Sequence, residues 1–388
     1  MRLKSLPIAC LLWLTALPAA AQTQRLGGPP RPEPTPAERA GQLRQLRELY
    51  QRAPAEWPAP TLDPGVEHHE LGPLPEVEKP SDLERAKAEL GEQLFFDPRL
   101  SGSRQIACAS CHDPDLGWAD GRTTSFGHNR RRLERNAPSI LNSRFRETLF
   151  WDGRADSLED QAVAVLSNAD EMHSGDEVLV ENLESIPDYV RRFGEVFGAH
   201  SPGVEQVSEA LAAFERTVVG SRTRFDAFVG GRHKAMTDEE ISGLHLFRTA
   251  GRCMNCHSGP LFTDDKFHAI GLSQYGRPGE DLGRYLVTEE AADVGAFRTP
   301  SLRNVARTRP YMHSGLFDLD EVLRLYNAGM PSERDKREAG GSVPPPTKSA
   351  LIKPLGLNDR DLRDIEAFLG SLTESNRRVR PPELPPGL

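Results

Sequence analysis

Two short stretches with the same pattern decide the fold: CASCH at residues 108–112 and CMNCH at residues 253–257. The chain has five cysteines, and Cys10 is the only one outside these stretches, so no pair is left for a disulfide elsewhere. In a Cys-x-x-Cys-His stretch the two thiols add to the vinyl groups of a haem, and the adjacent imidazole binds the iron as its fifth ligand. The pattern therefore predicts two covalently attached haem c groups.

The attachment chemistry assigns a role to every residue of the two patterns. The residues are Cys108, Cys111, Cys253 and Cys256 for the thioether bonds, and His112 and His257 for the irons. A four-cysteine zinc site and a thioredoxin-like redox pair are the alternatives for the same cysteines. Zinc does not require a histidine after each second cysteine, and a redox pair does not require a second copy. Haem attachment accounts for both features.

The sequence around the two stretches predicts helices, because strict apolar-polar alternation is rare and Gly and Pro break the chain into segments. The expected helices are 81–94, 155–166, 176–197 with a break at Pro187, 204–218, 237–250, 318–328 and 358–373. The two stretches lie 145 residues apart, each flanked by helices, which is a weak repeat at the scale of a domain. We expect an all-α fold with two tandem haem domains, residues 81–232 and 233–376, and long irregular loops.

Both ends of the chain differ in composition from the helical middle. Residues 1–21 have a basic flank, an apolar run and a small-residue end, which is the pattern of a cleaved signal peptide; an uncleaved anchor is the alternative. Residues 22–80 form a Pro-rich extension with one short helix expected at 37–52, either packed on the main body or solvated. Residues 377–388 are expected to be a disordered tail.

The charge balance excludes one class of partner. The formal net charge is −9, and without the two basic residues of the leader 57 acidic residues face 46 basic ones. A nucleic-acid binder would need a basic surface to meet phosphates, so we expect no nucleic acid. After residue 21 no stretch approaches the roughly 20 apolar residues that a membrane span requires. Because c-type haem is matured outside the cytoplasm, we expect an exported protein, in the periplasm.

Beyond the haem motifs, an ordered set of blocks resembles the bacterial dihaem cytochrome c peroxidase and MauG-like family. The resemblance covers roughly residues 81–375 and leaves out the extension 22–80. The blocks are LGEQLFFDPRLSGS (90–103), CASCHDP (108–114), TSFGH (124–128), RNAPSILN (135–142), FWDGRADSLEDQA (150–162), DEM (170–172), CMNCHSG (253–259), FRTPSLRNVA (297–306) and PYMHSG (310–315). The resemblance implies two cytochrome c-like domains, a peroxidatic one (81–232, haem 1) and an electron-transfer one (233–376, haem 2).

For the first haem, the resemblance implies a peroxide-reactive iron with His112 as proximal ligand. His128 matches the distal histidine that family peroxidases release on reductive activation; the residue pattern alone favours an ordinary loop histidine. Glu171 matches the distal acid, which moves a proton between the peroxide oxygens, and Gln161 matches its polar neighbour, which orients peroxide. Taken singly, either residue is more often a solvated side chain at a helix end.

Between the two haems, the resemblance implies a residue that relays electrons and a site that binds calcium. Trp151 aligns with the tryptophan that can pass an electron, and a plain core aromatic is the alternative. Asn136, with the backbone carbonyls of Thr308 and Pro310, matches a calcium site drawn from both domains; the alternative is that Asn136 only caps a turn. His313 remains unassigned.

For the second haem the sequence departs from the peroxidase pattern. Cytochrome c peroxidases use a methionine as the sixth ligand, which raises the potential of that haem. Here the helix alignment puts Tyr326, the MauG-like choice, at that position, with Met330, Met312 or no ligand as alternatives. A phenolate favours the oxidised states of iron.

The residues and the resemblance together predict a periplasmic peroxidase that reduces hydrogen peroxide to water. Its electrons would come from a small c-type cytochrome or cupredoxin, and its acidic surface would favour a basic donor. One alternative is a MauG-like enzyme that oxidises Tyr or Trp side chains of a partner protein. A second is a non-catalytic dihaem electron carrier, which Glu171 and Gln161 argue against. Homodimers occur in the family, and the sequence leaves the oligomeric state open.

Overall fold

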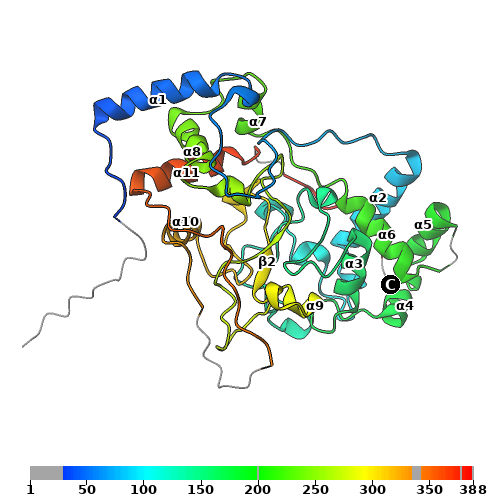
Figure 1. The fold of residues 1–388 in the computed structure, drawn as a ribbon. Coiled ribbons are helices and arrows are strands. Elements are labelled where there is room, and N and C mark those ends of the chain that lie inside the picture. The colour runs from blue at the N-terminus through cyan, green and yellow to red at the C-terminus, as the bar shows by residue number, and fades with distance from the viewer. Residues whose placement is uncertain (1–28, 199–200, 334–341, 376–377, 387–388) are drawn as a thin grey trace, which may run out of the picture.

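The computed structural model describes residues 29–198, 201–333, 342–375 and 378–386. Helices joined by long loops make up most of these residues (Figure 1). The helices are α1 (Pro36–Tyr50), α2 (Asp82–Phe96), α3 (Leu158–Ser167), α4 (Asp176–Glu184), α5 (Pro187–Phe197), α6 (Val204–Glu215), α7 (Arg224–Val229), α8 (Asp238–Arg248), α9 (Tyr285–Thr288), α10 (Leu319–Asn327) and α11 (Asp359–Ser371). In the described part, two short antiparallel strands, β1 (Phe267–Ala269) and β2 (Ala296–Arg298), form a small sheet. The expectation of a helical protein is confirmed, and this sheet is the exception.

The molecule has two apolar clusters, each built on a crossed pair of helices. In the first cluster α2 and α3 pack on α6, and in the second α8 and α10 pack on α11. A Cβ on Gly91 would lie 1.8 Å from the carbonyl oxygen of Ala210, and one on Gly243 would lie 1.9 Å from that of Asp364. Because neither glycine tolerates a side chain, both crossings bring backbone against backbone. A close helix crossing at a glycine therefore occurs once in each cluster, on the helix that precedes each haem motif.

The helix ends follow the local capping residues. α2 begins after Ser81, whose side chain and that of Glu84 form the expected capping box. α3 begins later than expected because Ser157 accepts a hydrogen bond from the Asp160 amide and so caps the helix. The break at Pro187 is confirmed, since it separates α4 from α5. Helix α7 was not expected because its six residues are too few to show a period.

The apolar packing passes from one cluster to the other between Val218 and Phe225. Helix α7 lies before residue 232, yet its Phe225 and Phe228 belong to the second cluster. The domain limits 81–232 and 233–376 stay a prediction. Because the side chains of α7 already pack in the second apolar cluster, the change from the first cluster to the second comes before residue 232.

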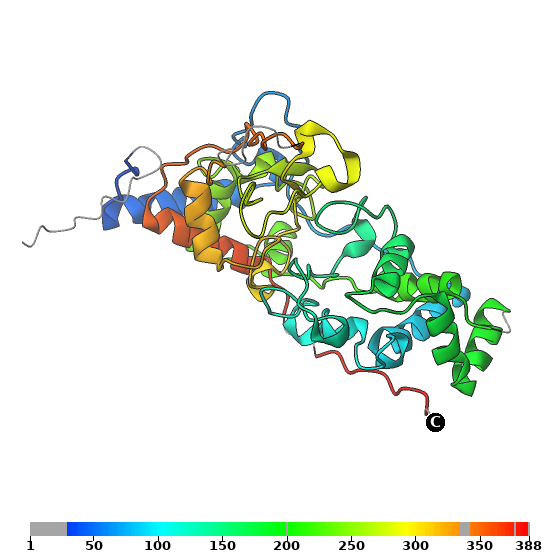
Figure 2. The same ribbon diagram turned by 90° about the horizontal axis from the view of Figure 1, so that it is seen from below.

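The N-terminal extension packs on the main body, which decides between its two sequence-based alternatives. Helix α1 lies against α8, and Tyr50, Trp57 and Leu71 enter the second apolar cluster. In both views α1 runs beside α8 and α11 at one end of an elongated molecule, with α4 and α5 at the other (Figures 1 and 2). The extension therefore adds to the second cluster, not to the first.

Residues 378–386 of the C-terminal tail, for which disorder stays a prediction, contact the main body in this structure. Gln93 donates a hydrogen bond to the Glu383 carbonyl oxygen at 3.0 Å, and Arg99 donates one to that of Pro385 at 2.8 Å. Val379 packs on the first apolar cluster. Figure 2 shows this segment running beneath α2, which explains why a Pro-rich stretch without a period of its own is held in place.

The predicted signal peptide, residues 1–21, lies outside the described residues. Among the helices of the described part, none has the length and apolar character needed to cross a bilayer.

Candidate functional site

One cavity of about 950 Å³ lies between the two clusters and is lined by residues of both motifs. The sequence-predicted residues on its wall are Cys108, Cys111, His112, Asn136, Trp151, Gln161, Glu171, Cys253, Cys256, His257, Thr308, Pro310 and Tyr326. His128 and Met330 are absent from this lining. The fold thus gathers most of the predicted site into a single space.

The two histidines of the motifs are held in the same way. Each motif begins with one short 3₁₀ turn, which places its histidine on the cavity wall. Nδ1–H of His112 donates to the Trp118 carbonyl oxygen at 3.3 Å, and Nδ1–H of His257 donates to that of Phe262 at 2.9 Å. Burial lowers the pKa of both imidazoles, so both are neutral at pH 7. Each ring therefore keeps Nε2 for a metal, with its tautomer fixed by the carbonyl.

The four cysteines fit haem attachment better than zinc. All four are free and half-buried, and burial raises the pKa of Cys108 and of Cys253 to about 12. Among the described residues the only group of ligand types close enough to share an ion is Cys256 with Asp264 and His268. Because the four thiols do not converge, the zinc alternative has no support. Two thiol pairs, each beside a neutral imidazole on an apolar wall, fit two haem c groups.

Two polar groups enter the cavity near the first motif. Gln161 extends from α3, and Glu171 follows that helix in the turn before α4. Burial raises the pKa of the Glu171 carboxyl, while the guanidinium of Arg154 opposes that shift. Arg154 is itself held by Asp152, at 3.1 Å to both carboxylate oxygens, and its guanidinium lies 3.4 Å from the centre of the Phe150 ring. A buried carboxyl and an amide on the same cavity wall suit proton transfer to or from a small bound molecule.

His128 lies near this pocket but not on its wall. Its ring stacks on His173 with centroids 4.3 Å apart, and its Nδ1 is buried without a hydrogen-bond partner. Its backbone amide donates to the carbonyl oxygens of Asp170 and Glu171, at 3.0 and 2.9 Å. In this conformation the loop is therefore fastened to the turn that carries Glu171, and the imidazole stacks on His173 and is absent from the cavity lining.

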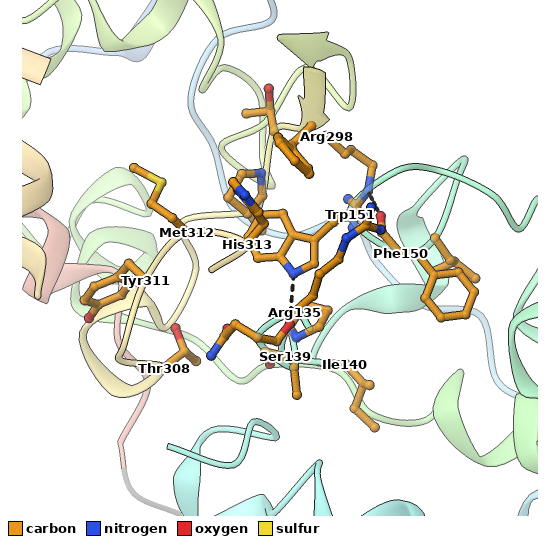
Figure 3. A pocket seen from close by; sticks show the side chains of 18 of the residues that line it. Arg135, Ser139, Ile140, Phe150, Trp151, Arg298, Thr308, Tyr311, Met312 and His313 are labelled. Carbon is orange, nitrogen blue, oxygen red and sulfur yellow. Dashed lines mark hydrogen bonds between the residues drawn. The ribbon is translucent and has the colours of Figure 1, made fainter. Parts of the chain in front are cut away.

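Trp151 lies on the wall of the shared cavity, near His313 and Arg135 (Figure 3). Its Nε1 donates to the Asn136 carbonyl oxygen at 2.9 Å, and its own carbonyl oxygen accepts from the Arg298 amide at 2.8 Å. The ring centre lies 6.4 Å from that of His313, which stacks on Phe297 at 3.7 Å. Trp151 is thus fixed by both halves of the chain, which is the placement that a relay between them requires.

His313, unassigned from the sequence, belongs to this interface. It is buried, and burial lowers its pKa to about 4, so it is neutral at pH 7. Its carbonyl oxygen accepts a hydrogen bond from the Asn136 amide at 2.7 Å. The loop 310–315 is thereby joined to the block that starts at residue 135.

The wall near the second motif carries Tyr326 and Met312. Burial raises the pKa of the Tyr326 phenol, and its nearest charged groups would be the thiols of Cys256 and Cys253. Met330 is buried outside the cavity lining, just past the end of α10. The sequence offered Tyr326 on α10 and Met330 directly after it as ligands. Of these two residues, Tyr326 is the one that lines the cavity beside the attachment loop.

The predicted calcium ligands lie close to the same interface. The Asn136 side-chain amide donates to the Arg122 carbonyl oxygen at 2.8 Å, which leaves its Oδ1 as the acceptor for a cation. Thr308 and Pro310 line the cavity as Asn136 does.

Sequence reasoning did not single out Arg154 or the pair Asp264 and His268. Arg154 stands inside the FWDGR block, so attention to charge within that block would have found it. His268 Nε2 lies 2.9 Å from Asp264 Oδ2, and this pair raises the pKa of His268 to about 10 against the effect of its burial. No spacing rule pointed to the pair. His268 lies in β1 and lines the cavity, and Asp264 lies in the loop before that strand.

The fold and this site define a class: helical proteins with two c-type haem attachment loops around a shared cavity. Comparison with known proteins gives the family. The family model for di-haem cytochrome c peroxidase matches residues 85–234. The cytochrome-c peroxidase IdrP1 of Denitromonas iodatirespirans is 39% identical over 349 residues, which cover 81% of this chain and 89% of that protein.

Two further proteins resemble this chain over most of its length. The methylamine utilization protein MauG of Methylorubrum extorquens is 40% identical over 311 residues, covering 79% of this chain and 84% of MauG. The crystal structure of a MauG-like protein associated with microbial copper homeostasis matches with a TM-score of 0.67 and 31% identity, over 81% of this chain and 96% of that one. The chain belongs to the di-haem cytochrome c peroxidase family.

Proposed function

We propose that this protein is a periplasmic peroxidase with two cytochrome c-like domains that reduces hydrogen peroxide to water. The observation that carries the proposal is the pairing of Glu171 and Gln161 on the cavity wall that His112 also lines. An electron carrier needs neither an acid nor an amide beside its iron. Family membership and the peroxidase names of relatives support the same reaction.

The chain's own residues divide the work of the reaction. A haem attached to Cys108 and Cys111 supplies, when bound, an iron at which peroxide can bind and take up electrons. Glu171 accepts the proton of the inner peroxide oxygen and delivers it to the outer one, which leaves as water. Gln161 orients the peroxide by hydrogen bonds without adding charge. The reduction of one peroxide to two waters consumes two protons and two electrons.

The electrons would enter through the second domain and pass Trp151. Its fixed position between Asn136 and Arg298 supports this path, because a rigid aromatic needs little rearrangement during transfer. Tyr326 is the proposed sixth ligand of the second haem. Calcium held by Asn136, Thr308 and Pro310 would hold the two domains in register.

The proposed donor is a small c-type cytochrome or cupredoxin. The net charge of −9 favours a basic donor surface, because opposite charges speed the encounter. The signal peptide at 1–21 supports the periplasm, where such donors occur.

Anaerobic titration with peroxide tests the proposal directly. Optical and EPR spectra are recorded with the protein fully oxidised and again after addition of one electron per molecule. Rapid reaction of the half-reduced form, with consumption of reduced cytochrome c, supports the peroxidase. Absence of reaction in both forms leaves only the electron carrier.

A MauG-like oxidase is the second candidate because Tyr326 lies on the cavity wall beside the second motif, whereas Met330 is absent from that lining. It predicts that the fully oxidised protein reacts with peroxide to give a long-lived oxidised state. It also predicts slow turnover with reduced cytochrome c, and oxidation of Tyr or Trp side chains in a partner protein.

A further inference from the structure

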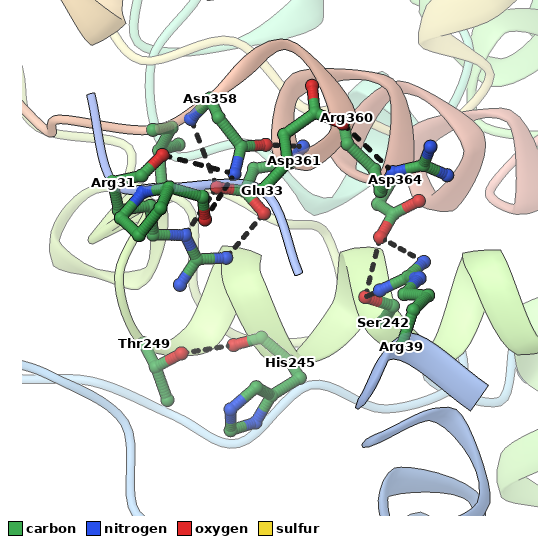
Figure 4. A network of polar contacts seen from close by, with 12 residues as sticks. Arg31, Glu33, Arg39, Ser242, His245, Thr249, Asn358, Arg360, Asp361 and Asp364 are labelled. Atoms are coloured by element: carbon green, nitrogen blue, oxygen red, sulfur yellow. Dashed lines mark hydrogen bonds and ion pairs between the residues drawn. The ribbon is translucent and has the colours of Figure 1, made fainter. Parts of the chain in front are cut away.

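The N-terminal extension is joined to the second cluster by a dense polar network (Figure 4). Arg31 forms an ion pair with Asp361, and Arg39 binds both Asp364 and the hydroxyl of Ser242. These contacts tie the first part of the extension to α8 and α11. The carboxylates of Asp361 and Asp364 are almost fully buried, so the arginines also neutralise charge that the core would otherwise hold unpaired.

A second part of the extension, residues 57–72, reaches the second haem attachment loop itself. We call this segment the strap. The Asp63 amide donates to Oδ1 of Asn255 at 2.8 Å, and Nδ2 of Asn255 donates to the Thr61 carbonyl oxygen at 3.0 Å. Asn255 lies between the two attachment cysteines. Two opposed hydrogen bonds therefore hold the middle of the attachment loop against the strap.

Charged contacts reinforce this joint on both sides of the loop. Asp63 Oδ2 lies 2.6 Å from Nη2 of Arg252, the residue before Cys253, and Asp63 also binds Lys353 at 2.9 Å. The two cations hold the pKa of the Asp63 carboxyl below its usual range. After the loop, the Gly259 amide donates to the His69 carbonyl oxygen at 2.9 Å.

The strap also supplies partners for a buried charge beneath the loop. Arg248, at the end of α8, is 1% exposed. It pairs with Glu70, donates to the Pro58 carbonyl oxygen at 2.9 Å and lies 5.3 Å from the centre of the Trp57 ring. An unpaired buried guanidinium would be strongly destabilising, so this core depends on the strap.

We propose that the strap is part of the second haem site. In this proposal Asp63 is a positioning residue that controls the charge and shape of the attachment loop. Through the loop, Asp63 controls the reduction potential of the haem held there. Asp63 places a carboxylate beside Arg252, which lies one residue from an attachment cysteine. A nearby cation favours the reduced haem because reduction adds an electron, and the carboxylate offsets that cation. The strap therefore lowers the reduction potential of the second haem, compared with the same attachment loop in the absence of the strap.

The test is a spectroelectrochemical titration of the holoenzyme in which the two haems are followed separately. Asp63→Asn keeps the backbone hydrogen bond and the size of the side chain but removes the charge. The reduction equilibrium of the second haem should shift about threefold or more toward the reduced form, which is about 30 mV for one electron, while the first haem stays unchanged. Lys353→Met removes the other cation on Asp63 and should shift the second haem in the opposite direction.

Arg47→Gln is the matched control, because it breaks an anchor of the same extension whose partner, Asp238, has a side chain that is 43% exposed, so the freed charge is solvated and both potentials should stay unchanged. An unchanged second haem in Asp63→Asn, an equal shift of both haems, or an equal shift in Arg47→Gln would overturn the proposal. The inference rests on haem attachment at Cys253 and Cys256. Covalent haems per chain are therefore counted in the parent and in each variant. Fewer than two haems in the parent would contradict the proposed function, whereas two haems in the parent and in Asp63→Asn with unchanged potentials would contradict the strap proposal alone.

Discussion

The two attachment loops differ in almost everything except their sequence pattern. Each begins with one 3₁₀ turn and each histidine donates to a carbonyl oxygen. Around the first loop lie Gln161 and Glu171, and His128 stacks on His173 outside the cavity lining. Around the second loop lie Tyr326 on the inside and the strap on the outside.

This difference separates attachment from reactivity. The five-residue pattern carries the covalent chemistry and the fifth ligand, because these need only groups that are adjacent in the chain. What faces the other side of each iron comes from segments far away in the sequence. The proposed function assigns proton transfer to the first site and the holding or passing of an electron to the second.

The largest expected effect comes from removing the acid of the first site. Glu171→Gln keeps the shape of the side chain but cannot carry the proton, so turnover with peroxide should fall about 10²- to 10⁴-fold. Steady-state oxidation of reduced cytochrome c measures it, with the haem content unchanged. Glu177→Gln makes the same change on the exposed first turn of α4 and should leave turnover as it was. Full turnover in Glu171→Gln would remove the contrast between the two sites.

A change at the second site should act on potential instead of on proton transfer. Tyr326→Met replaces a phenolate ligand by a thioether, which favours reduced iron. The reduction equilibrium of the second haem should move about 100-fold, or about 120 mV for one electron. Met330→Leu is the control, because Met330 is not on the cavity wall. If only Met330→Leu shifts the potential, Tyr326 is not the ligand.

The gating role that the family resemblance implies for His128 gives a third test. His128→Gly should let the fully oxidised protein react with peroxide at a rate within about tenfold of the half-reduced form, because no imidazole remains to close the iron. Stopped-flow spectra of both redox states measure this ratio. His233→Gly removes another half-buried histidine, outside the cavity lining, and should keep the dependence on reduction. The same dependence in His128→Gly would end its place among the ligands.

The last test concerns stability and pH, and it leaves turnover and potential aside. Glu215 on α6 is 6% exposed, and burial raises its pKa to about 8. Because this folded-state pKa lies above the unfolded value, the stabilisation is complete below about pH 4.5 and is lost as pH rises to about 8. Glu215→Gln lacks this loss, so its free energy of unfolding should exceed that of the parent by about 4 kcal/mol at pH 8, at about 1.4 kcal/mol per pKa unit, and by nothing at pH 4.

Denaturant unfolding at the two pH values measures this difference. Glu205→Gln, an exposed change on the same helix, should show no dependence on pH relative to the parent. A constant difference for Glu215→Gln at both pH values would mean that the carboxyl is not held neutral by burial.

Local patterns predicted the helices well and long-range packing poorly. The capping box at Ser81 and the break at Pro187 depend on neighbours within four residues, and both were found in the sequence. The crossings at Gly91 and Gly243 and the contacts of the tail depend on distant backbone. Nothing within a few residues of these positions signals such contacts.

The same division applies to the site. The sequence by itself determined the two haem attachment loops, the helical character and, through motif order, the family. Only the tertiary structure decided that Tyr326 and not Met330 faces the cavity, that His128 is turned toward His173, and that the strap covers the second loop. The physical reason is range: attachment needs groups adjacent in the chain, whereas potential, proton transfer and access depend on which distant side chains the fold brings around each iron.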